Sequence, residues 1–366
     1  MYKKTLILYL TFTLVSITSY TQNLQPGFDK RECMELLKVF SRWGDSTFYQ
    51  GIPESEDFKR VYGSPTMGLE NRWELYTGKQ NNIALLNIRG TTTDPVSWLE
   101  NFYAAMVPAN GSITLSKKLT FDYQLATHPK AAVHVGWLIG MGFLATDMLP
   151  KIDSCYKAGV RDFLIMGHSQ GGALAYLLTS HLYHLRETGK LPADIRLKTY
   201  CMAAPKPGNL YYAYDYEERT RGGWAFTVVN AADWVPEVPI SIQTVNDFNQ
   251  TNPFKNAKAG IKKQSFPRKV VLNHVYSQLT KHTLRAQRRY QKYLGRKTSR
   301  FVKSQLKGIK VPDFVDSNHY VRTGTFVVLQ PDEAYFQQFP DSDTKIFIHH
   351  LIQPYLYLVE KIEQTP

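Results

Sequence analysis

The chain has 366 residues, of which 43% are hydrophobic and 20% are charged, and its formal net charge is +13. This length and composition indicate a globular protein with a large buried core, in one large domain or two modest ones, and exclude a repeat protein or a low-complexity chain. The positive charge is concentrated in one segment, because residues 251–310 contain 17 Lys and Arg and no Asp or Glu. The rest of the chain therefore carries a small net negative charge.

The first residues, MYKKTLILYLTFTLVSITSYTQ, have the three-part pattern of a secretory signal peptide. Lys3 and Lys4 form a basic start, an apolar run covers residues 6–17, and small polar residues follow. We expect a signal peptide at residues 1–21 and a mature domain at residues 22–366, exported to the periplasm or the medium. The alternative is an N-terminal membrane anchor, for which the apolar run is short.

The three cysteines, Cys33, Cys155 and Cys201, have no spacing that selects a disulfide pair. We expect Cys155 and Cys201 to be small buried residues. No cluster of cysteine and histidine has metal-ligand spacing, so we predict neither a metal site nor a cofactor.

The first half of the chain contains a predicted helix, two predicted strands and a second helix. Asp29, followed by Glu32 three residues on, has the pattern of a capping box opening a helix. Residues 71–78 and 81–90 are expected to form strands on either side of a turn. Residues 95–109 predict a helix that Pro95 starts and Pro108 stops.

The second half alternates strands with helices. Strands are predicted at 160–167, 194–205, 224–236 and 323–331, a helix at 172–187, and a helix or strand-to-helix segment at 345–362. This alternation is typical of an α/β fold with a mainly parallel central sheet flanked by helices. The basic stretch at about 241–320 has helical character and is expected to be an insertion between two sheet strands.

Residues 167–171, Gly-His-Ser-Gln-Gly, fit the Gly-x-Ser-x-Gly pattern between a strand and a helix. Such an elbow holds its serine in a strained turn, and Gly167 and Gly171 leave room for the close approach of backbone. The Ser169 hydroxyl is then presented at a helix N-terminus, which favours developing negative charge. The alternative is an ordinary glycine-rich turn.

A serine nucleophile needs a histidine base, which in turn needs an orienting carboxylate. In α/β-hydrolases these follow the serine in the order acid, then histidine. Asp233 directly follows a predicted strand, and Glu237 is its rival farther into the loop. The histidines after Asp233 are His274, His282, His319, His349 and His350, of which the first two lie in the basic segment and are poor candidates. His134 and His168 precede the serine, and neither is expected to act as the base.

Six motifs in order resemble the class 3 lipase family, the fungal-type triacylglycerol lipases with their plant and bacterial relatives. They are NIRGTTT with SWLENF, AAVHVGWL (131–138), GHSQGGALA, TYCMAAPKPGN (199–209), VVNAADWVPEVP and HHLIQPYL. Together they cover about residues 70–240 and 343–358.

This resemblance implies an α/β-hydrolase fold, with Ser169 as nucleophile, Asp233 as acid and His350 as base. In the family pattern the histidine precedes Tyr-Leu by five residues, which selects His350 and leaves its neighbour His349 as the alternative. The resemblance also implies an oxyanion hole made by Thr91 and the backbone N–H of Gln170. The segment after the oxyanion strand, 95–113, is expected to be a lid or a packed helix. More residues separate Asp233 from His350 along the sequence than usually separate the acid from the histidine in this family.

The basic segment has three interpretations: an anionic membrane surface as partner, a polyanion site, or a solvated helix whose charges keep it soluble. No nucleic acid is expected as partner of an exported hydrolase. We predict a secreted serine carboxylic-ester hydrolase of lipase or esterase type, working through an acyl-enzyme on a lipid or other ester. The alternatives are a phospholipase A1 acting on anionic lipid and a non-catalytic surface-binding protein on the same scaffold.

Overall fold

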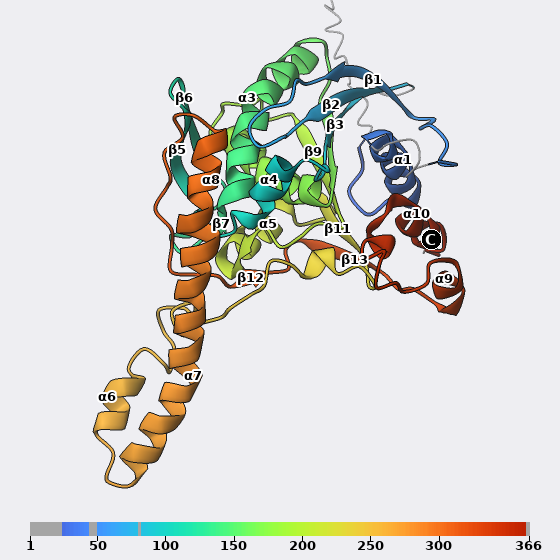
Figure 1. Cartoon of the computed structure of the whole chain (residues 1–366). Coiled ribbons are helices and arrows are strands. Elements are labelled where there is room, and N and C mark those ends of the chain that lie inside the picture. Colours follow the sequence, from blue (N-terminus) through green and yellow to red (C-terminus); the bar gives the residue numbers. More distant parts are fainter. Residues whose placement is uncertain (1–23, 44–49, 80–81, 364–366) are drawn as a thin grey trace, which may run out of the picture.

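The computed structural model describes residues 24–43, 50–79 and 82–363, so the predicted signal peptide lies outside the described residues. A seven-stranded sheet runs through the centre in the order β1-β2-β3-β8-β9-β11-β13 (Figure 1). Its strands are β1 (Phe58–Gly63), β2 (Trp73–Gly78), β3 (Ile83–Ile88), β8 (Asp162–His168), β9 (Arg196–Met202), β11 (Ala225–Asn230) and β13 (Thr325–Leu329). The five strands from β3 to β13 are parallel, and β1 and β2 are antiparallel at one edge. The predicted α/β-hydrolase class is confirmed by this sheet.

Helices cover both faces of the sheet and give each face its own core. One face carries α3 (Val135–Lys157), α4 (Gln170–Glu187) and α5 (Leu210–Thr220), and the other carries α1 (Lys30–Phe40), α9 (Glu333–Gln338) and α10 (Ile352–Glu360) (Figure 1). Strand β8 supplies both cores alternately, with Phe163 and Ile165 on the α4 side and Leu164 and Met166 on the α1 side. All four are fully buried, as expected for a central parallel strand.

The predicted helix at 95–109 is wrong in its second half. Helix α2 (Pro95–Phe102) begins at the expected proline, but residues 106–108 form strand β4 (Met106–Pro108). β4 pairs with β7 (Ala132–His134) in a small sheet that β10 (Gly208–Asn209) and β12 (Tyr320–Val321) complete. A hairpin of β5 (Asn110–Ser116) and β6 (Leu119–Gln124) follows. Pairing with distant strands overrides the helical preference of the Ala-Ala-Met run.

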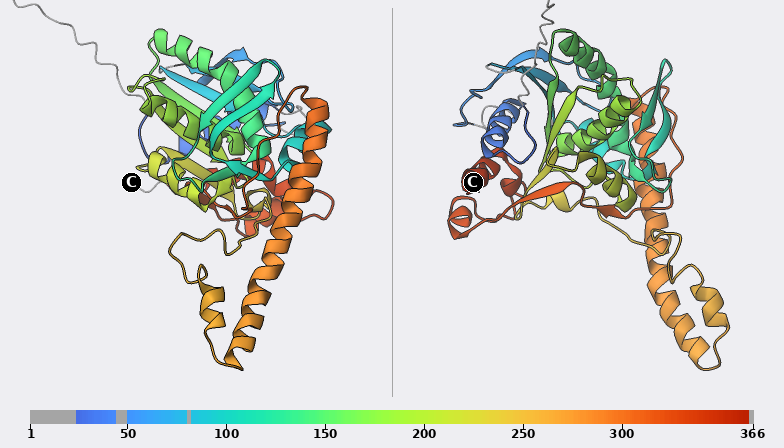
Figure 2. Two further views of the ribbon diagram at one scale, coloured as in Figure 1. Left: turned by 90° about the vertical axis from the view of Figure 1, so that its left-hand side faces the viewer. Right: turned by 180° about the vertical axis from the view of Figure 1, so that it is seen from behind.

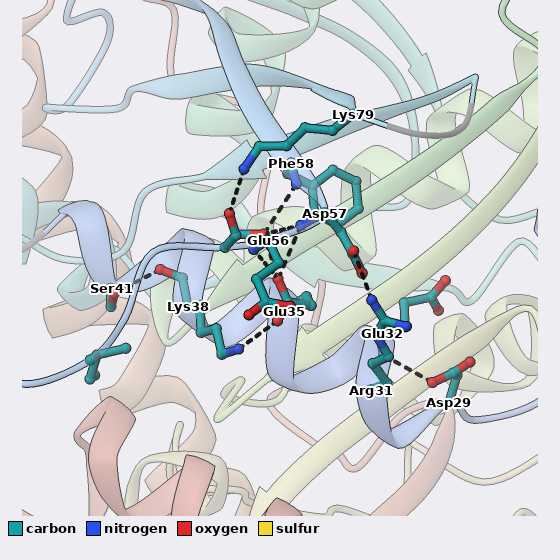
Figure 3. Close-up of polar contacts among 12 residues, drawn as sticks. Asp29, Arg31, Glu32, Glu35, Lys38, Ser41, Glu56, Asp57, Phe58 and Lys79 are labelled. Atoms are coloured by element: carbon teal, nitrogen blue, oxygen red, sulfur yellow. Dashed lines mark hydrogen bonds and ion pairs between the residues drawn. The ribbon is translucent and has the colours of Figure 1, made fainter.

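Helix α1 fixes the start of β1 through a buried carboxylate. The Glu35 Oε2 atom accepts hydrogen bonds from the Ser55 hydroxyl and the Glu56 amide, both at 2.7 Å (Figure 3). At the other end of α1, Asp29 Oδ1 accepts from the Glu32 amide at 2.9 Å, which is the predicted cap. The Glu32 carboxylate does not complete the capping box, because Lys198 and Tyr200 bind it instead at 2.6 Å each. Two short 3₁₀ turns are η1 (Ser41–Trp43) and η2 (Val235–Glu237).

The predicted insertion lies between β11 and β13; its distal part projects from the body, and its last helix packs on the body (Figures 1 and 2). It contains α6 (Ala257–Lys262), α7 (Arg268–Gln291), the π-helical η3 (Lys292–Lys297) and α8 (Thr298–Gln305). The C-terminal segment predicted at 345–362 has no strand and consists of the 3₁₀ turn η4 (Ile348–His350) followed by α10.

All three cysteines are free. Cys33 and Cys201 are buried, whereas Cys155, expected to be buried, is only half-buried on α3. None of the helices in the described part of the chain has the length and apolar character that a membrane crossing requires.

Candidate active site

Ser169 lies at the turn between β8 and α4 with a backbone that non-glycine residues rarely adopt, φ 61° and ψ −130°. A Cβ atom on Gly167 would lie 2.1 Å from the Gly171 carbonyl oxygen, and one on Gly171 would lie 2.4 Å from the Ile88 carbonyl oxygen. Both positions therefore require glycine, as the sequence predicted. The serine is half-buried while its neighbours on both sides are buried, so part of Ser169 is accessible to solvent.

Asp233 and His350 are in direct contact although 117 residues separate them. The His350 ring donates from Nδ1 to Asp233 Oδ2 at 2.7 Å, and the Tyr355 hydroxyl donates to the same oxygen at 2.8 Å. The other oxygen, Oδ1, accepts from the Val235 amide at 3.0 Å. This contact engages Nδ1 and leaves Nε2 as the ring nitrogen that can accept a proton.

The imidazole of His350 packs against His168, the residue directly before Ser169. Their ring centroids are 4.6 Å apart. Burial lowers the pKa of His168 well below its ordinary value, and the neighbouring His350 ring lowers it further, against a hydrogen bond to the His350 backbone. A neutral His168 thus lies beneath the site as a packing surface. Its contact places His350, the predicted general base, next to the turn that carries Ser169.

His349, the alternative base, has both ring nitrogens engaged elsewhere. Nδ1 accepts from the Tyr335 hydroxyl at 2.7 Å, and Nε2 donates to Asp341 Oδ1 at 3.0 Å. No ring nitrogen is left to take a proton from a serine, so the geometry favours His350.

The remaining sequence candidates lie away from this contact. Glu237 is exposed at the end of η2, and the acid position is occupied by Asp233. His274 and His282 lie on the exposed surface of α7, and the half-buried His319 precedes β12.

The segment predicted to hold the oxyanion lies directly on the elbow. A Cβ atom on Gly90 would be 2.9 Å from the His168 carbonyl oxygen and 3.5 Å from Ser169 Cβ. The next residue, Thr91, donates its hydroxyl to the Gln170 side-chain oxygen Oε1 at 2.8 Å. Gln170 is the first residue of α4, so no carbonyl of the helix accepts its backbone N–H. The structure therefore brings together the two predicted oxyanion residues, and also links them through the Gln170 side chain, which sequence reasoning missed.

Asn101 holds Thr91 in place from behind. Its Nδ2 donates to Thr91 Oγ1 at 2.9 Å, and its Oδ1 accepts from Trp137 Nε1 at 2.9 Å. His134 donates from Nε2 to the Asn101 carbonyl at 3.1 Å and accepts the Trp137 amide at Nδ1 at 3.2 Å. Burial lowers the pKa of His134 to about 3, so the ring is neutral. Through these hydrogen bonds, His134 and Trp137 of the Val-His-x-Gly-Trp motif fix the position of Asn101 and thereby of Thr91.

Glu100 is a fully buried carboxyl group beside these residues. Burial raises its pKa to about 8, although hydrogen bonds with Asn71 and Gln170 oppose the increase. Asn71 Nδ2 donates to Oε2 at 2.6 Å, and a Cβ atom on Gly140 would lie 2.3 Å from Oε1. In the sequence Glu100 has the pattern of an ordinary polar helix residue, and no motif singles it out.

Three partly exposed aromatic rings form a cluster that contacts His350 through Phe347. Phe347 lies 5.9 Å from His350, 6.1 Å from Trp98 on α2 and 5.3 Å from Trp234, centroid to centroid. Trp234 donates from Nε1 to the Ile346 carbonyl at 2.8 Å. An aromatic cluster therefore lies beside His350, and α2 is a packed helix that contributes Trp98 to it.

Comparison with known proteins identifies the central segment. Residues 85–242 match the family model described as Lipase (class 3), which confirms the resemblance inferred from the motifs. The segment contains Thr91, Ser169 and Asp233 and ends before His350.

Among curated proteins, the chain is 26% identical over 204 residues to a secreted mono- and diacylglycerol lipase of Malassezia globosa, covering 54% of this chain and 56% of that protein. It is 36% identical over 109 residues to a triacylglycerol lipase of Ricinus communis, covering 29% of this chain and 20% of that protein. The chain thus spans about half the length of the first relative and a fifth of the second.

Among solved structures, the chain is similar to a fungal lipase in complex with an inhibitor, with 18% identity and a TM-score of 0.43 over 57% of this chain and 74% of that one. The Rhizomucor miehei lipase propeptide complex matches with 21% identity and a TM-score of 0.41, over 63% of this chain and 72% of that one.

Proposed function

Given a class 3 lipase segment at residues 85–242, we propose that this protein is a serine carboxylic-ester hydrolase of triacylglycerol lipase or esterase type. One observation carries the proposal: the contact of His350 with Asp233, packed against the residue that precedes an elbow serine. His350 lies outside the matched segment, so its role rests on this geometry and on the HHLIQPYL motif.

In the proposed reaction the Ser169 hydroxyl attacks the ester carbonyl while Nε2 of His350 takes its proton. Asp233 stabilises the imidazolium that forms, and Tyr355 and the Val235 amide hold Asp233 in place. The tetrahedral oxyanion accepts hydrogen bonds from the Gln170 amide and from Thr91, whose hydroxyl turns from the Gln170 side chain.

Collapse of this intermediate expels the alcohol, which receives the proton from His350, and leaves an acyl-enzyme on Ser169. Water activated by the same histidine then releases the acid and restores the hydroxyl. No cofactor enters these steps.

The substrate class is proposed from the aromatic cluster beside His350 and from the names of the relatives. Trp98, Trp234 and Phe347 offer an apolar surface to an acyl chain next to His350. The relatives bear names that refer to mono-, di- and triacylglycerols, which supports a lipid ester. Export through a signal peptide is proposed from the N-terminal sequence pattern, and the first relative is itself named as secreted.

The test measures hydrolysis of p-nitrophenyl esters of several chain lengths by the purified protein and by Ser169→Ala. We expect the variant to lose activity by a factor on the order of 10⁴ or more. A fluorophosphonate probe should label wild type and not the variant. Equal hydrolysis by both proteins would refute the proposed chemistry, and a wild type that neither hydrolyses esters nor takes up the probe would favour the non-catalytic alternative.

The cationic insertion favours a second candidate, a phospholipase A1-type hydrolase acting on anionic lipid. The same panel, extended to phosphatidylglycerol and phosphatidylcholine with the released fatty acid identified by position, distinguishes the two. Release from the sn-1 position of phosphatidylglycerol at a rate above that from triacylglycerol would support the phospholipase.

A further inference from the structure

Residues 251–310 are named here the cationic arm; its distal part projects from the body as a helical hairpin, whereas α8 packs on the body and buries Val302 (Figure 2). The distal part consists of α6 beside the first half of α7. Almost every side chain of residues 255–279 is exposed. A projecting hairpin with so little buried surface contributes little to the core of the hydrolase, so its composition reflects what it meets outside.

The arm carries a large charge without internal compensation. None of its 17 Lys and Arg side chains forms an ion pair with a carboxylate in the described part of the chain. Four of them, Lys262, Lys263, Arg268 and Lys269, lie at the turn between α6 and α7 and are exposed. This concentration of charge favours a negatively charged partner.

The same hairpin also exposes large apolar side chains. Val271, Val275 and Leu279 recur every four residues on one side of α7 and are 60%, 48% and 62% exposed. Phe266, at the turn between α6 and α7, is 82% exposed. An apolar stripe of this kind on a soluble helix indicates a contact surface.

The root of the arm is tied to the segment that follows the oxyanion residue. The Ala105 amide, three residues after α2, donates to the Leu294 carbonyl at 3.2 Å. A Cβ atom on Gly295 would lie 2.9 Å from Ala105 Cβ. Helix α8 also packs against α2, the helix that carries Trp98. A surface bound by the arm is therefore held in a fixed relation to α2 and to the aromatic cluster that contains Trp98.

We propose that the cationic arm docks the protein on an anionic lipid surface, with the turn cations at the head groups and the apolar stripe in the interface. Two other partners fit less well. Pairing with the arm of a second copy of the chain would bring like charges together, and binding to a nucleic acid would leave the apolar stripe exposed to water. An anionic lipid surface matches both the charge and the stripe. Docking goes beyond the proposed ester hydrolysis and does not depend on it.

The experiment measures partitioning of the Ser169→Ala protein, which leaves lipids intact, onto vesicles of phosphatidylcholine alone or mixed with phosphatidylglycerol. The charge variant is Lys262→Gln, Lys263→Gln, Arg268→Gln and Lys269→Gln, and the stripe variant is Val271→Ser, Val275→Ser and Leu279→Ser. A matched control removes four exposed cations elsewhere: Lys59→Gln, Lys118→Gln, Lys190→Gln and Arg221→Gln. Thermal melting of every variant checks folding. The charge, stripe and control substitutions are also made in the protein that retains Ser169, and its hydrolysis of a soluble ester is measured.

Each cation near an anionic surface multiplies affinity about fivefold, so we expect the charge variant, which lacks four of them, to lose affinity for the mixed vesicles by a factor of about 600. The stripe variant should lose at least about tenfold, and the control should stay within about threefold of the parent. Equal binding to both kinds of vesicle would overturn the proposal, as would equal losses in the charge variant and the control. Strong binding to heparin without vesicle binding would show a polyanion site instead and would also overturn it.

Discussion

Replacing Glu100 with glutamine tests whether a neutral carboxylic acid lies behind the oxyanion segment. Glu100 is fully buried, and its hydrogen-bonding neighbours are Asn71 and Gln170. Glutamine has nearly the same shape, keeps an oxygen for the Asn71 donor and cannot ionise. The substitution therefore removes the titration and leaves the packing against Gly140 in place.

The sign of the effect follows from the two ends of the titration. In the unfolded chain the carboxyl loses its proton near pH 4.5, whereas in the folded protein burial raises its pKa to about 8. The contribution of the protonated Glu100 side chain to the free energy of unfolding is complete below pH 4.5. It is lost as pH rises from 4.5 to about 8. Each pH unit there costs about 1.4 kcal/mol, so Glu100 alone lowers the free energy of unfolding by roughly 3–4 kcal/mol between pH 5 and pH 8.

The assay is urea denaturation of wild type and Glu100→Gln at intervals from pH 5 to pH 9. We expect Glu100→Gln to gain stability relative to wild type with rising pH, by an amount approaching that loss. Glu54→Gln, which removes an exposed carboxylate, should follow the wild-type curve. A constant difference between wild type and Glu100→Gln across the whole range would show that Glu100 does not hold a proton in the folded protein, and the reasoning would fail.

Five further substitutions, in three comparisons, test the site. His350→Ala should reduce ester hydrolysis by a factor on the order of 10⁴. His349→Ala should stay within about tenfold of wild type but lower the melting temperature, because it loses the contacts with Tyr335 and Asp341. Equal kinetic losses in the two variants would contradict the assignment of His350 as the base. Thr91→Val should lower kcat on the order of 10²-fold with little change in KM, and Thr91→Ser should restore much of it; an unchanged kcat in Thr91→Val would exclude a hydroxyl donor. Tyr355→Phe removes a donor from Asp233 and should cost about 1 kcal/mol in urea unfolding and about tenfold in kcat; kinetics equal to wild type would show that Asp233 is held without it.

Local sequence patterns predicted the parts of the fold that local forces decide. The Asp29 cap, the proline that opens α2 and the strand–glycine–serine turn at 167–171 are all found in the structure. The helix expected through residue 109 failed because Met106–Pro108 pairs with a strand at 132–134, a contact that periodicity does not reveal.

The same limit applies to the candidate site. Motif order and spacing pointed to Asp233 and His350, with His349 as the alternative, and the structure places the first two side chains in contact. Glu100 and Asn101 were missed because their importance comes from burial against Gln170, Thr91 and Trp137 rather than from spacing. The arm was recognised from its charge, but only the three-dimensional arrangement shows how far it projects and where its root is attached.

The glycines around Ser169 have a consequence for how such a site can change over time. Gly171 lies against the Ile88 carbonyl and Gly90 against the His168 carbonyl, so contacts between backbone atoms set the spacing between Ser169 and the Gly90–Thr91 segment. The parallel register that pairs Ile88 with Gly167 holds both segments at the same height. If the proposed chemistry holds, the aromatic side chains beside His350 can be exchanged while Ser169 and the Gly90–Thr91 segment keep their positions, so the choice of substrate can change independently of the geometry of the proposed reacting groups.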